Sequence, residues 1–333
     1  MHCANGTFRL TNDVNRAFLL ASAEFRGAAR HLPQNAVFLI TWLSIVVRIV
    51  ANPLSNVLQK LAARDGASPT FIIAATHGLL TIAVVPLLGQ SPWPRESAFW
   101  TNMALCAVLA AASNALLVQA MRLADLSVLG PINAYKAVVS LLPGIVLLGE
   151  VPTAAALAGI ALIVVGSYCL SDPPTEREAA IGRDTRRWGF SRGVRYRVAA
   201  LVLSATEAVF LKRALVHASP TVAFAWWAVL GLAAAMLIGL LPQVRTAWRD
   251  ELRHAVRVPR LYLALAATTG LMQYCTLVAF AEVQVAAALA LFQTSAIVSV
   301  LLGHRIFREP HVVRRLLGSL VMVAGAVVIV VSR

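Results

Sequence analysis

Long apolar stretches separated by short polar gaps fill the sequence after its first 36 residues. Several of these stretches reach the roughly 18–20 residues that a helix needs to cross a hydrocarbon core about 30 Å thick. The expected fold class is therefore an all-α polytopic membrane protein with ten transmembrane helices. The predicted spans lie at about 37–61, 69–89, 99–121, 126–148, 153–171, 196–217, 220–241, 261–281, 285–306 and 311–331.

Three polar segments lie between or before these spans. Residues 1–36 combine scattered arginines with a weak apolar spacing, which favours a polar N-terminal segment at the membrane interface. Residues 172–195 are rich in arginine and are expected to link two halves of the chain. Residues 242–260 carry Trp248 and Leu252 at helical spacing, which indicates a helix lying along the membrane surface.

The two halves of the sequence resemble each other. We therefore expect a first repeat at 37–171 and a second at 196–331. Each repeat holds five spans, an odd number, so the second enters the membrane from the opposite side and the repeats are inverted. At a shift of 159 residues the matched pairs are Ala120 and Ala279, Ser140 and Ser299, Gly144 and Gly303, Glu150 and Glu309, Gly159 and Gly318, and Gly166 and Gly325.

The composition agrees with a membrane protein and excludes several other classes. Of 333 residues, 59% are hydrophobic and 13% charged, too little charge to coat a soluble enzyme of this length. The net charge of +14 lies mostly in the gaps between spans, where lipid headgroups sit, and no nucleic-acid recognition motif accompanies it. No zinc-protease HExxH, CxxC or phosphate-binding loop motif is present, so we expect neither an enzyme nor a cofactor.

A longer motif carries a family resemblance. The stretch LADLSVLGP at 123–131 is followed by SLLP at 140–143, LGE at 148–150, Gly159 and Gly166. This series resembles the EamA-like repeat of the drug/metabolite transporter superfamily, and a second copy runs from 279 to 325. The resemblance implies a ten-helix permease, usually an exporter in the bacterial inner (plasma) membrane, with both termini in the cytoplasm. It leaves the substrate open, because the superfamily moves amino acids, sugars, nucleotide-sugars, organic ions and drugs.

The charge distribution disagrees with the family about orientation. Assigned by loop parity, eight Lys and Arg residues lie on the side of the termini and nineteen on the other side. The positive-inside rule therefore predicts termini outside the cytoplasm, whereas the resemblance implies termini inside. Both orientations stay open at this point.

The first span carries the most informative polar pattern. Arg48, Asn52, Ser55, Asn56 and Gln59 follow one helical face. A charge near the bilayer centre costs about 2.5–3.5 kcal/mol on insertion scales, so this face is expected to point inward. The stripe predicts a pathway for a substrate or ion, and interhelical hydrogen bonding is the alternative.

Two further charges lie deep in predicted spans. Lys136, with Asn133 one turn before it, is expected to be a cation that faces the substrate, unless it forms a permanent ion pair with Glu207. Glu207 is the only carboxylate deep within a predicted span. It could serve as a proton site, as a countercharge that the substrate displaces, or as a fixed structural partner, and the three roles stay open.

Uncharged polar residues complete the candidate pathway. Asn114 and Gln273 occupy equivalent positions in the two repeats, and their amides can both donate and accept hydrogen bonds, which suits zwitterionic solutes. Tyr274 and Gln293 are weaker candidates. For all four residues, packing between helices is the alternative interpretation.

Other prominent residues are expected to be structural. Glu150 and Glu309 each precede a new span, where the helix dipole favours an acid. The glycine pairs at seven-residue spacing predict close helix contacts. His77 is interpreted as a hydrogen-bonded packing residue.

Together these patterns predict a secondary active transporter that works by alternating access, with proton coupling through Glu207 as one option. The excess of deep cations favours a small anionic or zwitterionic metabolite as the solute, amino-acid-like in the first instance, and the family resemblance implies export. The alternatives are an exchanger of phosphorylated or nucleotide-linked sugars and a flippase for a lipid-linked glycan. The expected partners are a small-molecule substrate and membrane lipid, and the oligomeric state stays open.

Overall fold

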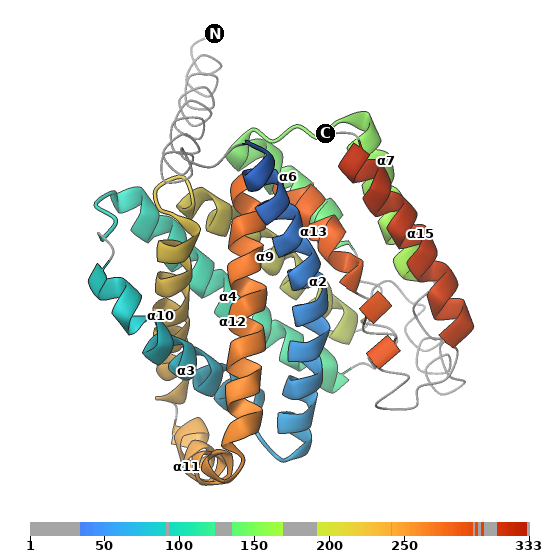
Figure 1. Cartoon of the computed structure of the whole chain (residues 1–333). Helices are drawn as coiled ribbons and strands as arrows, with labels where there is room; N and C mark the ends of the chain where they lie inside the picture. Colours follow the sequence, from blue (N-terminus) through green and yellow to red (C-terminus); the bar gives the residue numbers. More distant parts are fainter. Residues whose placement is uncertain are drawn as a thin grey trace. The chain divides into compact units, whose positions relative to one another are not determined.

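The computed structural model describes residues 34–90, 93–123, 135–168, 192–240, 242–295, 297–298, 301–302 and 312–331. Within them it contains eleven helices and no strand (Figure 1), so the all-α prediction is confirmed. The helices are α2 (Gln34–Arg64), α3 (Pro69–Gln90), α4 (Ser97–Leu123), α6 (Lys136–Leu148), α7 (Ala154–Tyr168), α9 (Arg192–Ala214), α10 (Pro220–Gly239), α11 (Pro242–Arg257), α12 (Pro259–Glu282), α13 (Val285–Gln293) and α15 (Val312–Val331).

The described helices follow the apolar pattern of the sequence. Four helical stretches among them are long and apolar enough to cross a membrane, at Asn35–Ala63, Thr70–Gly89, Pro220–Gly239 and Pro259–Glu282. Shorter apolar helices occupy Lys136–Leu148, Ala154–Gly166 and Leu320–Ile329. Residues 1–33 and 169–191, which include most of the predicted N-terminal segment and linker, lie outside the described residues.

The helices gather into two compact units. Unit 1 consists of Met1–Val108 and Phe210–Val283, and unit 2 consists of Leu109–Val209 and Gln284–Arg333. Each unit therefore takes helices from both halves of the sequence.

Unit 1 is built from two helix pairs. Helix α2 packs along α12, and α3 packs along α10, while α12 also contacts α3 and α10. The ring of His77 on α3 fills the space beside Gly231 on α10, where any Cβ would clash with it. The His77 Nδ1 atom lies 3.2 Å from the carbonyl oxygen of Ala228, and its ring packs on Trp227 with centroids 4.5 Å apart. These contacts agree with the interpretation of His77 as a hydrogen-bonded packing residue.

Unit 2 contains a close contact between α7 and α15. A Cβ built on Gly159 would lie 2.6 Å from the carbonyl oxygen of Gly325, and one on Gly166 would lie 2.6 Å from that of Gly318. The two helices are therefore antiparallel, and glycine allows their backbones to touch, as the seven-residue spacing predicts. A shift of 159 residues takes Gly159 to Gly318 and Gly166 to Gly325, so each contact is converted into the other. This exchange is expected when two inverted copies meet.

Candidate functional site

The packing of α2 on α12 is tied together by polar side chains. Arg48 donates a hydrogen bond from Nε to Oγ1 of Thr276 at 3.2 Å. Ser55 Oγ and Thr269 Oγ1 are 2.7 Å apart. The two contacts are seven residues apart on each helix and run in opposite directions, so α2 and α12 lie antiparallel in constant register (Figure 1).

Two amide residues lie on the same facing sides. Asn52 is half-buried and sits on the face of α2 between the two bonded residues. Gln273 is 8% exposed and sits on the corresponding face of α12. We call this set the α2–α12 polar seam: Arg48, Asn52, Ser55, Thr269, Gln273 and Thr276.

The hydroxyl of Thr276 has a defined direction. It donates its proton to the carbonyl oxygen of Met272 at 2.8 Å, so its oxygen acts as the acceptor for Arg48. Beside it, the thiol of Cys275 is hydrogen-bonded to Ser44 of α2. Arg48 is therefore hydrogen-bonded to a hydroxyl group whose own direction is set by the backbone of α12. A planar cation held in this way can recognise a carboxylate or phosphate through paired hydrogen bonds.

The sequence predicted four of the six seam residues, since Ser55 belongs to the polar stripe of the first span. Arg48, Asn52 and Gln273 were candidate pathway residues, and the structure brings them together within unit 1. Thr269 and Thr276 were missed. Their spacing around Gln273, at four residues before and three after, was the available signal because it places all three on one helix face.

Two other candidates of unit 1 lie off the seam. Asn56 is exposed. Tyr274 is 37% exposed, and its hydroxyl lies 3.3 Å from Oγ1 of Thr221 on α10. Its ring meets that of Phe224 edge-on, with centroids 5.7 Å apart. Tyr274 therefore belongs to the contact between α12 and α10.

The remaining candidates belong to unit 2. Asn114 on α4 is exposed. Lys136 is the first residue of α6, Glu207 lies on α9, and Gln293 is the last residue of α13; all three are half-buried, and none is without a partner. Asn133 lies outside the described residues.

Glu150 caps a different helix from the one that follows it. Its Oε2 accepts a hydrogen bond from the backbone N–H of Val285 at 2.8 Å, at the first residue of α13. The next helix in the chain, α7, is capped instead by Thr153, whose hydroxyl accepts from the N–H of Ala156 at 3.1 Å. Glu150 does accept a hydrogen bond at the start of a helix, as expected, but that helix lies in the other repeat.

Lys212 corrects the charge count used for orientation. It lies near the end of the predicted span 196–217 and was one of the eight cations assigned to the side of the termini, yet it is only 2% exposed. Its Nζ donates to the carbonyl oxygen of Val283 at 2.7 Å, at the C-terminal cap of α12. A cation at this end is favoured by the helix dipole, which explains how a lysine can be buried there.

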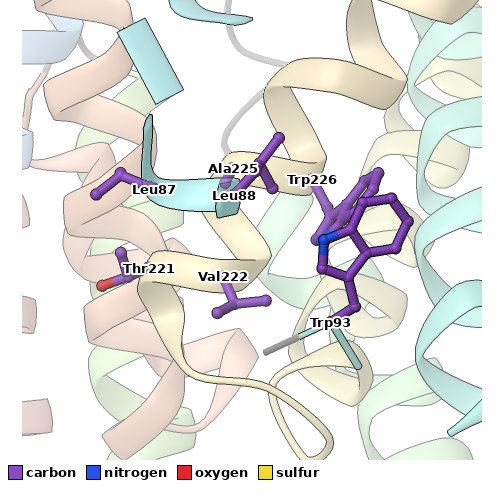
Figure 2. A pocket seen from close by; sticks show the side chains of 7 residues that line it. All are labelled: Leu87, Leu88, Trp93, Thr221, Val222, Ala225 and Trp226. Carbon is purple, nitrogen blue, oxygen red and sulfur yellow. The ribbon is translucent and has the colours of Figure 1, made fainter. Parts of the chain in front are cut away.

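Figure 2 shows a small hollow in unit 1 beside Trp93 and Trp226. The rings of Trp93 and Trp226 pack directly against each other, with centroids 4.8 Å apart. The hollow measures about 10 Å³, close to the space that one water molecule needs. It is therefore too small for a metabolite. Its other lining residues are Leu87, Leu88, Thr221, Val222 and Ala225.

Comparison with known proteins supplies the family. The model of the EamA-like transporter family matches residues 39–172 and again 191–331. One solved crystal structure of a protein matches with a TM-score of 0.60 and 18% sequence identity, over 90% of this chain and 98% of its own, which indicates a shared fold. A search of curated proteins gave no match.

The two family matches together cover most of the chain, one in each half of the sequence. Members of this family are multi-pass membrane transporters of small molecules. The chain belongs to the EamA-like transporter family, within the drug/metabolite transporter superfamily.

Proposed function

We propose that this transporter is a secondary active exporter of a small anionic or zwitterionic metabolite, amino-acid-like, in a bacterial-type plasma membrane. The observation that carries the proposal is Arg48, a half-buried arginine near the middle of α2, oriented by Thr276. A carboxylate on the solute would pair with its guanidinium group, and the amides of Asn52 and Gln273 would contact the neutral or amino part.

The seam itself argues against a purely structural role for this arginine. Ser55 and Thr269 form the same kind of bridge between α2 and α12 with two small hydroxyl groups. Because hydroxyls suffice to join these helices, an arginine at position 48 adds an insertion cost of about 2.5–3.5 kcal/mol without need. Binding an anion supplies a reason for that cost.

The transport cycle would follow from the inverted repeats. The solute site would open to either side in turn, and an ion gradient would drive the cycle, since the sequence has no phosphate-binding loop for ATP. We assign the proton-binding role to Glu207, a half-buried carboxylate of α9. Its protonation would then alternate with binding of the solute to Arg48.

Uptake and counterflow in proteoliposomes test this proposal, with a panel of radiolabelled amino acids and small carboxylates. We expect at least one labelled solute to be transported, and Arg48→Gln to reduce its rate more than tenfold. Ser55→Ala is the matched control on the same helix face and should stay within about twofold. Wild-type rates in Arg48→Gln would overturn the proposal. Strict counter-transport of sugar phosphates in the same panel would favour the exchanger instead.

A further inference from the structure

Helix α11 connects two helices that are long enough to cross a membrane. It follows α10 and precedes α12, and it contacts both. Figure 1 shows α11 across the ends of these two helices. A helix in this position lies at a membrane surface, because both of its neighbours in the chain enter the bilayer.

The inner face of α11 is fastened to the start of α3. Glu251 Oε2 accepts from the backbone N–H of Ser68 at 3.1 Å and from its hydroxyl at 2.9 Å. Trp248 donates from Nε1 to Thr70 Oγ1 at 3.3 Å, and its ring meets that of Phe71 edge-on. These contacts fix the rotation of α11 about its own axis, so its outer face is defined.

The outer face carries two adjacent stripes. Leu252 and Val256 are 57% and 69% exposed, although both are apolar. Arg249, Arg253 and Arg257 are also exposed and follow one another at four-residue spacing. Going around the helix at 100° per residue, the inner face is followed by the apolar stripe and then by the arginines.

Acids do little to neutralise this face. Asp250 is the exposed acid of α11, and it lies 3.2 Å from Arg253 in a pair in which both side chains are about four-fifths exposed. Glu251 points inward to Ser68. At the next helix start, Arg260 adds a further exposed cation. The face is therefore strongly positive beside an exposed apolar stripe.

We propose that the outer face of α11 binds the headgroups of anionic phospholipids, with Arg249, Arg253 and Arg257 on the phosphates and Leu252 and Val256 among the upper acyl chains. An interfacial helix places its apolar stripe at the acyl boundary and its cations at headgroup level. A soluble acidic partner would use the arginines and leave the neighbouring apolar stripe in water. A lipid satisfies both stripes at once.

Native mass spectrometry of the delipidated full chain in detergent tests this site, with phosphatidylglycerol and phosphatidylcholine as probes. We expect phosphatidylglycerol to bind more tightly. The variant Arg249→Gln/Arg253→Gln/Arg257→Gln should weaken this binding more than tenfold, since each arginine near an anionic surface contributes roughly fivefold in affinity. The matched control removes three other exposed arginines, at 95, 192 and 195, and should stay within about threefold.

Three results would overturn the proposal. These are equal binding of phosphatidylglycerol by the wild type and the α11 variant, equal binding of both lipids, and displacement of the lipid by soluble glycerol phosphate. A second variant, Leu252→Ser/Val256→Ser, keeps every charge and tests the apolar stripe separately. It should also weaken lipid binding, and unchanged binding would contradict the assignment of that stripe to the acyl chains.

Discussion

The α2–α12 contact of unit 1 and the α7–α15 contact of unit 2 solve the same packing problem in different ways. Both pairs are antiparallel and join one helix of each repeat. The α7–α15 contact relies on Gly159, Gly166, Gly318 and Gly325, which let the backbones touch. The α2–α12 contact relies on polar groups, including an arginine near mid-helix. Among the side chains that the structure describes, glycines mark the closest approach of α7 to α15, so the arginine of the seam calls for another explanation.

The glycine contact should be the more sensitive to added volume. We expect Gly159→Leu to destabilise the protein by about 1–3 kcal/mol or more, because its Cβ alone would lie 2.6 Å from a backbone oxygen of α15. Thermal unfolding in detergent measures this effect. Gly89→Leu is the matched control, since a Cβ there meets nothing within 4 Å. Equal melting temperatures for the two variants would contradict the close contact.

Glu150 is a charged residue that caps a helix of the other repeat. We expect Glu150→Ala to cost about 1 kcal/mol by removing the cap of α13. Hydrogen exchange should accelerate at the start of α13, around Val285. Thr153→Ala removes the cap of α7 and should accelerate exchange around Ala156 instead. If Glu150→Ala accelerated exchange only in α7, the cross-repeat cap would be wrong.

The smallest stability effect is expected at the hydroxyl bridge of the seam. Ser55→Ala should cost about 0.6 kcal/mol, the average for one hydrogen bond between membrane helices. Thermal unfolding of Ser55→Ala, Thr269→Ala and the double variant measures the coupling. A double variant as destabilised as the sum of the single ones would show that the two hydroxyls do not interact.

Local sequence patterns predicted most of the helices, because such patterns extend over a single segment of the chain. Apolar length predicted α3 at 69–89, against Pro69–Gln90 in the structure, and the spacing of Gly159 and Gly166 predicted a close contact. Both features are periodic within one segment. The partner helix of that contact was not predicted, because spacing within one helix says nothing about its neighbour.

The roles that were not predicted correctly depend on contacts between residues far apart in the sequence. Glu150 caps a helix that begins 135 residues later, and Lys212 binds a carbonyl group 71 residues away. Contacts between residues so far apart cannot be recognised from the local composition of the sequence. In the candidate site, the polar face of α2 was predictable from periodicity. The bond from Arg48 to Thr276 was not, because the spacing of the threonines around Gln273 marks a polar face of α12 but does not tell which helix it meets.

The affinity of Arg48→Gln for a solute that the wild type transports tests the central claim most directly, when it is measured together with the melting temperature. If Arg48 binds the solute, the Kd of the solute should weaken at least tenfold while the melting temperature stays the same or rises, because a half-buried charge that is costly to insert has been removed. Arg48→Lys should recover part of the affinity. An unchanged Kd with a lowered melting temperature would show instead that Arg48 only joins α2 to α12.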